Sequence, residues 1–156
     1  MAAGWDWEGD ESLLRFHSPS EWDAAYECGR VRRMGSAVIG LAFNCTLTEA
    51  SPRIVKAMRL PDMAEKGFAF TAAGVAARVN RELTPELYAA LRAEGHRGFA
   101  ETAVDDTLTF VPFRQLPPWF KWRTVASKVL DKLETWRLNI TYAAEDAHKA
   151  LRRRRS

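Results

Sequence analysis

The stretch Phe110-Val111-Pro112-Phe113-Arg114-Gln115-Leu116-Pro117-Pro118-Trp119-Phe120-Lys121-Trp122 decides how the chain is organised. It holds five aromatic residues, three prolines and two basic residues. Because proline lacks a backbone N–H and fixes φ, this composition predicts a rigid turn. The chain before this turn is expected to form a helical body, residues 18–111. The turn itself and a long C-terminal helix make up residues 112–151.

Apolar residues recur every three or four positions after this turn. The members are Trp122, Val125, Val129, Leu133, Trp136, Ile140, Ala144, Ala147 and Leu151. Such spacing places them on one stripe of a helix of about thirty residues, or of two collinear shorter helices. Residues 152–156 then form a basic tail.

Helix start signals precede the turn. Ser18-Pro19 and Thr84-Pro85 each combine an N-cap side chain with proline at the first helical position, and Gly95 can close the second helix. Ser51-Pro52 repeats the signal. These three dipeptides and Pro117-Pro118 are 33 residues apart, a spacing that leaves a helical repeat open.

Two segments are ambiguous. Periodicity does not decide whether Ala37–Thr48 is a helix or a buried strand, and Leu108–Val111 reads as extended before Pro112. We therefore expect a mainly all-α single domain over residues 1–156, with five or six helices and at most a short β element. Residues 1–17 are expected to form an irregular acidic arm.

Length and composition are those of a folded protein. The chain has 156 residues, of which 47% are hydrophobic and 28% charged, enough for one buried core. Its start lacks the basic and apolar segments of a secretory signal. The longest apolar run, Ala37–Phe43, is too short to cross a bilayer. We expect a cytoplasmic protein with no membrane partner.

Charge is distributed unevenly along the chain. Residues 1–27 hold seven acids and one base, whereas residues 121–156 hold four acids and ten bases. The two ends can simply attract each other. Alternatively, the basic end, with Arg152, Arg153, Arg154 and Arg155, binds nucleic acid or an acidic partner.

Catalytic motifs are missing from the sequence. No glycine-rich phosphate loop, paired-cysteine zinc spacing or nucleophile elbow occurs, and the three histidines are far apart. Asp105-Asp106 has carboxylates for cation binding or acid–base chemistry, but adjacent acids fit a solvated turn or helix cap better. We predict no enzyme, no catalytic residue, no metal and no cofactor.

Part of the chain resembles a known family. Glu94-Gly95, Arg97, Asp105-Asp106 and the run from Val111 to Lys121, followed by a long helix, resemble the ryanodine-receptor repeat domain, which also occurs as a small stand-alone domain in bacteria and phages. The resemblance covers about residues 84–138. It implies a non-enzymatic module with two antiparallel helices joined by an ordered loop, used for interaction and, in bacteria, suspected of sensing nucleotide-derived ligands.

These observations predict a binding or interaction module. Its candidate site offers positive charge to an anionic, nucleotide-like ligand or an acidic protein partner, and tryptophan rings for stacking. The candidate residues are Arg97, Arg114, Trp119, Lys121, Trp122 and Arg123. The alternative is an immunity-type or inhibitor protein that binds a basic protein through its acidic N-terminal face.

Overall fold

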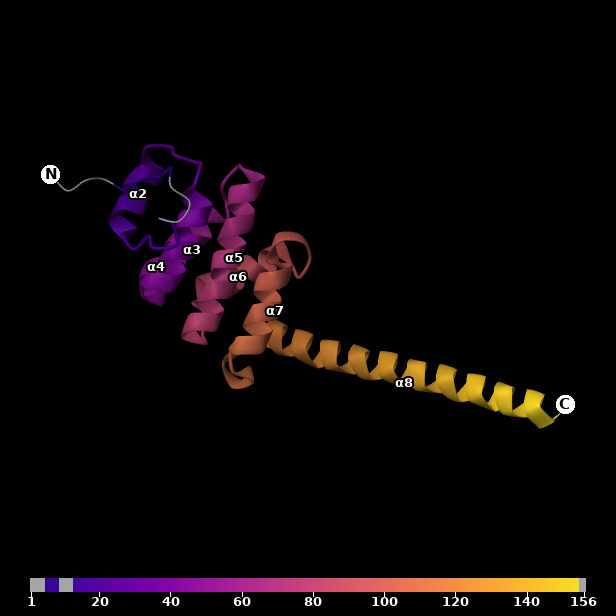
Figure 1. Cartoon of the computed structure of the whole chain (residues 1–156). Helices are drawn as coiled ribbons and strands as arrows, with labels where there is room; N and C mark the ends of the chain where they lie inside the picture. Colours follow the sequence, from indigo (N-terminus) through magenta and orange to yellow (C-terminus); the bar gives the residue numbers. More distant parts are fainter. Residues whose placement is uncertain (1–4, 9–12, 155–156) are drawn as a thin grey trace. The chain divides into compact units, whose positions relative to one another are not determined.

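A computed structural model describes residues 5–8 and 13–154 of the chain (Figure 1). Seven α-helices, two short 3-10 helices and no strand occur among these residues, which confirms the all-α class and gives one helix more than expected. The elements are α2 (Pro19–Glu27), α3 (Met34–Asn44), α4 (Leu47–Ala57), α5 (Met63–Asn80), α6 (Pro85–Glu94), η1 (Gly98–Ala100), α7 (Glu101–Phe110), η2 (Phe113–Gln115) and α8 (Pro118–Arg154).

The chain divides into two compact units. The first, Met1–Pro117, is called the body here, and the second, Pro118–Ser156, contains α8. Their boundary falls inside the Pro-rich turn, between Pro117 and Pro118. The single-domain organisation stays a prediction.

Local capping fixes two helix starts as predicted. The Ser18 hydroxyl accepts a hydrogen bond from the Glu21 N–H at 3.4 Å, and the Thr84 hydroxyl accepts one from the Leu87 N–H at the same distance. Proline occupies the first turn of both helices. Gly95 follows α6 with φ of 89°, so the predicted end of that helix is also confirmed.

Ser51-Pro52, in contrast, is not a helix start. Both residues lie inside α4, which begins four residues earlier behind the N-cap Thr46. Thr46 and Glu49 form a complete capping box, in which each side chain accepts the other residue's backbone N–H. The series of helix starts at a 33-residue spacing is therefore broken at this position.

Both ambiguous segments are helical. Residues 37–44 belong to α3, and α7 continues to Phe110, so the expected extended segment Leu108–Val111 is wrong. Proline disfavours helical geometry only at the residue before it. Accordingly, Val111 alone is extended, with φ of −83° and ψ of 128°. The Thr107 hydroxyl donates to the Ala103 carbonyl oxygen, which keeps this β-branched residue compatible with a helix.

Glycine ends the first helix of the body early. Helix α2 ends at Glu27, shortly before Gly29 turns the chain with φ of 78°. Gly35, in contrast, lies inside α3. Helix α5 starts behind the N-cap Asp62, whose side chain accepts the backbone N–H groups of Ala64 and Glu65.

Helix α5 is the centre of the body and packs against α3, α4 and α7 (Figure 1). Small residues make this packing close. A Cβ atom on Gly35 would lie 2.0 Å from the backbone oxygen of Glu65, and one on Gly74 would lie 2.6 Å from the Asp106 carboxylate. Gly35 therefore requires glycine, because its close contacts are backbone atoms, whereas the close contact at Gly74 is the end of a side chain.

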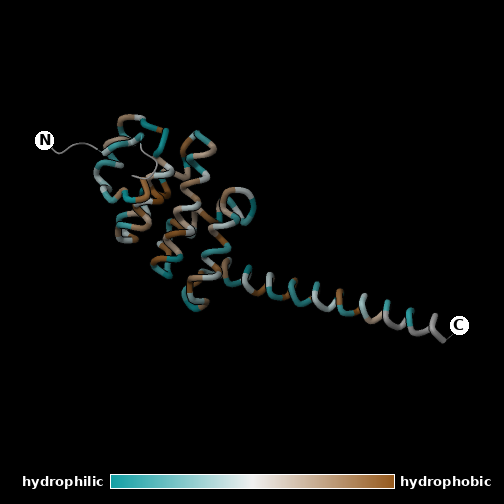
Figure 2. The backbone as a smooth tube through the Cα atoms, viewed as in Figure 1, coloured by the Kyte–Doolittle hydropathy of each residue, from teal (hydrophilic) through white to brown (hydrophobic). Residues whose placement is uncertain are grey.

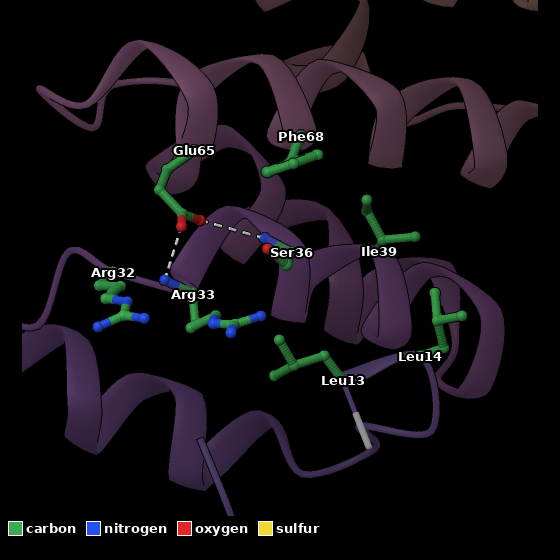
Figure 3. A pocket seen from close by; sticks show the side chains of 8 residues that line it. All are labelled: Leu13, Leu14, Arg32, Arg33, Ser36, Ile39, Glu65 and Phe68. Atoms are coloured by element: carbon green, nitrogen blue, oxygen red, sulfur yellow. Dashed lines mark hydrogen bonds between the residues drawn. The ribbon is translucent and has the colours of Figure 1, made fainter. Parts of the chain in front are cut away.

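The Glu65 carboxylate, from α5, caps the start of α3 (Figure 3). It accepts backbone N–H groups from Arg33 at 2.7 Å, Gly35 at 2.7 Å and Ser36 at 3.3 Å. Helix α3 has no side-chain cap of its own. Since the first N–H groups of a helix lack internal partners, one charge from α5 satisfies three of them and also opposes the positive end of the helix dipole.

Substituting Gly35→Ala should destabilise the body, because its Cβ meets backbone atoms that cannot move aside. We expect a loss of about 3 kcal/mol in the free energy of unfolding, measured by urea denaturation. Gly67→Ala is the matched control: its Cβ would lie 3.4 Å from the Phe99 ring, an ordinary contact. That variant should gain up to about 1 kcal/mol from helix propensity. Equal effects at the two positions would contradict this packing.

Substituting Glu65→Gln should weaken the junction of α3 and α5 while keeping the side chain's shape. The amide replaces one accepting oxygen with a donor that faces backbone N–H groups, so we expect a loss of about 2–3 kcal/mol. Amide hydrogen exchange at Gly35 and Ser36 should accelerate more than exchange in α6. Glu101→Gln, an exposed first-turn residue of α7, should cost less than about 1 kcal/mol.

Candidate interaction surface on the C-terminal helix

The six predicted site residues divide between the two units. Arg97 precedes η1 and Arg114 lies in η2, and both are exposed residues of the body. The other four, Trp119, Lys121, Trp122 and Arg123, lie within the first two turns of α8. We call these four the aromatic–basic patch.

Helical spacing brings two of the patch side chains together. Trp119 and Arg123 are four residues apart, and the Arg123 guanidinium lies 5.8 Å from the centre of the Trp119 ring, a cation–π distance. Trp119 also contacts Phe120 edge-to-face, with ring centres 4.8 Å apart. The Nε of Arg123 has no hydrogen-bond partner among the described residues. The patch therefore presents an oriented guanidinium beside aromatic area.

Trp122 is the most exposed large apolar residue of the described chain, at 71%. Tryptophan carries more apolar surface than any other side chain, so leaving it in water is unfavourable. An exposed tryptophan beside paired aromatic and basic groups is typical of the residues that dominate protein interfaces.

The rest of α8 is exposed as well, which the sequence did not reveal. Every side chain from Ser127 to Glu145 is exposed, and Figure 2 shows apolar positions recurring among polar ones along the helix. The described large members of the stripe are between 45% and 71% exposed. They are Trp122, Val125, Val129, Leu133, Trp136 and Ile140. Periodicity identified the stripe, but an amphipathic pattern does not show whether its apolar face is covered.

Basic residues border the first half of the stripe. Helix geometry places Lys128, Lys132 and Arg137 within about 100° of its centre, and all three are exposed. The acids Asp131 and Glu134 lie on the opposite side of the helix. Residues 152–154, expected as part of a tail, continue α8, while Arg155 is outside the described residues.

A hollow of about 480 Å³ lies between α3, α5 and the residues before α2 (Figure 3). Its apolar wall includes Ile39 and Phe68, and Arg32 and Arg33 stand at its edge. Glu8 already engages these arginines: its carboxylate lies 3.9 Å from Arg32, and its backbone oxygen accepts from Arg33 at 3.4 Å. The carboxylate of Glu65 in this hollow is committed to the α3 cap.

The acidic N-terminal face is partly neutralised by the body itself. Asp23 forms a bidentate ion pair with Arg53, and Glu8 also lies 4.0 Å from Arg30. Asp10 and Glu11 lie outside the described residues. The surface behind the inhibitor alternative is therefore less negative than the sequence count indicates.

Metal binding and membrane insertion each require recognisable features of a structure. Within residues 5–8 and 13–154 no group of three or more His, Cys, Asp or Glu side chains could hold a metal ion. No helix in this part of the chain is long and apolar enough to span a membrane. In the body, Asp106 pairs with Arg78 at 2.9 Å, which gives one of the two adjacent acids a structural role.

The stretch that resembles the ryanodine-receptor repeat domain covers α6, η1, α7, η2 and the first half of α8. Comparison of the chain with protein-family models, with curated proteins and with solved structures finds no match. The family resemblance therefore stays a prediction.

Proposed function

We propose that the protein is a non-enzymatic interaction module that binds an acidic protein surface through the aromatic–basic patch. The observation that carries the proposal is the pairing of Arg123 with the Trp119 ring beside the exposed ring of Trp122. Lys121 lies two residues before Arg123 and adds a second positive charge on another side of α8.

The chemistry of the patch favours carboxylates on an apolar background. An arginine held by a neighbouring ring loses less side-chain entropy when it binds than a freely rotating one, and its planar fork matches a carboxylate. Tryptophan adds buried area at low entropic cost. An acidic segment with apolar side chains would use both groups, whereas a purely charged polymer would use only the cations.

Two other ligand classes are less well supported. A small nucleotide-like anion would need converging donors, but the two cations of the patch, Lys121 and Arg123, are two residues apart and so lie on different sides of α8. Nucleic acid binding by the basic end would draw on Arg152–Arg155 and be governed by salt. The resemblance to the ryanodine-receptor repeat domain agrees with an interaction module and adds no residue to the patch.

Fluorescence anisotropy with a labelled peptide of Glu and Leu residues tests the proposal. The full-length protein should bind this peptide and not its Lys-for-Glu counterpart. Lys121→Ala combined with Arg123→Ala should weaken binding about tenfold, because both charges and the ring-supported guanidinium are lost. Trp122→Ala alone should have a comparable effect.

The matched control is Lys128→Ala with Lys132→Ala, which removes the same charge from α8 outside the patch. It should change the affinity less than about twofold, as expected for screened surface charge. Equal weakening by the two double variants would show that only net charge matters and would refute the patch. Displacement of the peptide by micromolar ATP would instead indicate a small-anion site.

A further inference from the structure

We infer that two copies of the chain associate through α8, antiparallel, along the part of the stripe from Val125 to Ala144. This interface goes beyond the proposed function, because it uses the helix after the aromatic–basic patch. The large apolar side chains of this segment are between 45% and 65% exposed. They are Val125, Val129, Leu133, Trp136 and Ile140.

The stripe repeats every eleven residues. Steps of three, four and four residues lead from Trp122 to Leu133, and the same steps lead from Leu133 to Ala144. Eleven residues in three turns give about 3.67 residues per turn, close to the 3.6 or so of a straight α-helix. The stripe therefore stays on one face along α8, and a second straight helix can follow it with little supercoiling.

Side-chain size favours the antiparallel direction. The part of the stripe from Val125 to Ala144 is bulky towards its start and has a small residue at its end, so reversing the second copy sets Val129 opposite its Ala144. A parallel pair would set alanine against alanine and leave a gap there, which costs packing energy. In the antiparallel pair the two Trp136 rings meet near the two-fold axis, where offset stacking is favourable.

The charged borders favour the same direction. In an antiparallel pair, equivalent sides of the two helices meet, so Lys132 lies beside Asn139 of the second copy and Lys128 beside its Ala143. A parallel pair would place Lys132 beside Arg137 of the second copy. Exposed like-charge pairs are destabilising, and the antiparallel arrangement leaves only the Arg137 side chains facing each other near the axis.

The area available fits a reversible dimer. The paired segment is about 30 Å long, and a helix with side chains is about 10 Å wide, so the two helices together bury on the order of 600 Å². Stable complexes bury about 1,200–2,000 Å². We therefore expect association in the micromolar range, visible as a dependence of mass on protein concentration.

Sedimentation equilibrium of the full chain from about 1 to 200 µM, a range that brackets such affinities, tests the inference. The weight-average mass should rise from 17.6 kDa towards twice that value. Val129→Glu with Leu133→Glu should abolish the rise. Ser127→Glu with Leu138→Glu, two exposed positions on the opposite face of α8, should leave it unchanged. A wild-type monomer throughout this range, or equal behaviour of the two variants, would overturn the inference.

Disulfide trapping tests the direction. In a background of Cys28→Ser and Cys45→Ser, proteins carrying Val129→Cys and Ala144→Cys should cross-link when mixed, and neither should cross-link alone. Cross-linking of Val129→Cys with itself would show a parallel pair and overturn the antiparallel register. Binding of the acidic peptide is measured at Lys121 and Arg123, so either proposal can fail without the other.

Discussion

The junction of α3 and α5 depends on the hydrogen bonds that backbone N–H groups at the start of α3 donate to the Glu65 carboxylate. Helix α3 begins in a left-handed turn at Arg33, with φ of 71°, and none of its own side chains caps it. A carboxylate with 8% exposure would be costly without partners. Each element therefore satisfies a need of the other: the helix end gains acceptors and the buried charge gains donors.

This exchange depends on the close approach of α3 and α5. The carboxylate reaches the amides because Gly35 lets the backbone of α3 lie directly against the backbone of α5 near Glu65. The same logic operates on the other side of α5, where Gly74 makes room for Asp106 and that acid pairs with Arg78. The body thus uses small residues to bring helices near enough for polar contacts between them.

The sequence predicted the parts of the fold that depend on neighbouring residues. Ser18 and Thr84 cap helices by contacts three residues away, so their signals were readable. Glu65 caps a helix thirty residues earlier, and no local pattern announces that. The expectation of an extended segment over Leu108–Val111 is wrong, because the steric effect of Pro112 reaches only the residue before it.

The candidate site was predictable to the extent that it lies on one helix. Trp119 and Arg123 meet because an α-helix brings residues four apart together, which follows from sequence alone. Arg97 and Arg114 were grouped with them by composition, a criterion without geometry. The exposure of the stripe was not predictable either, since a helix face that packs on a core and one that awaits a partner have the same periodicity.

The eleven-residue period of α8 has a consequence for changes in its length. Inserting eleven residues would lengthen the helix by about 16 Å. It would leave the aromatic–basic patch nearly aligned with the stripe, because eleven residues complete about three helical turns. Inserting five would rotate the patch to about the far side. A change in the length of α8 therefore keeps the patch aligned with the stripe only when the inserted residues complete nearly whole turns, and any other change turns the patch away from it.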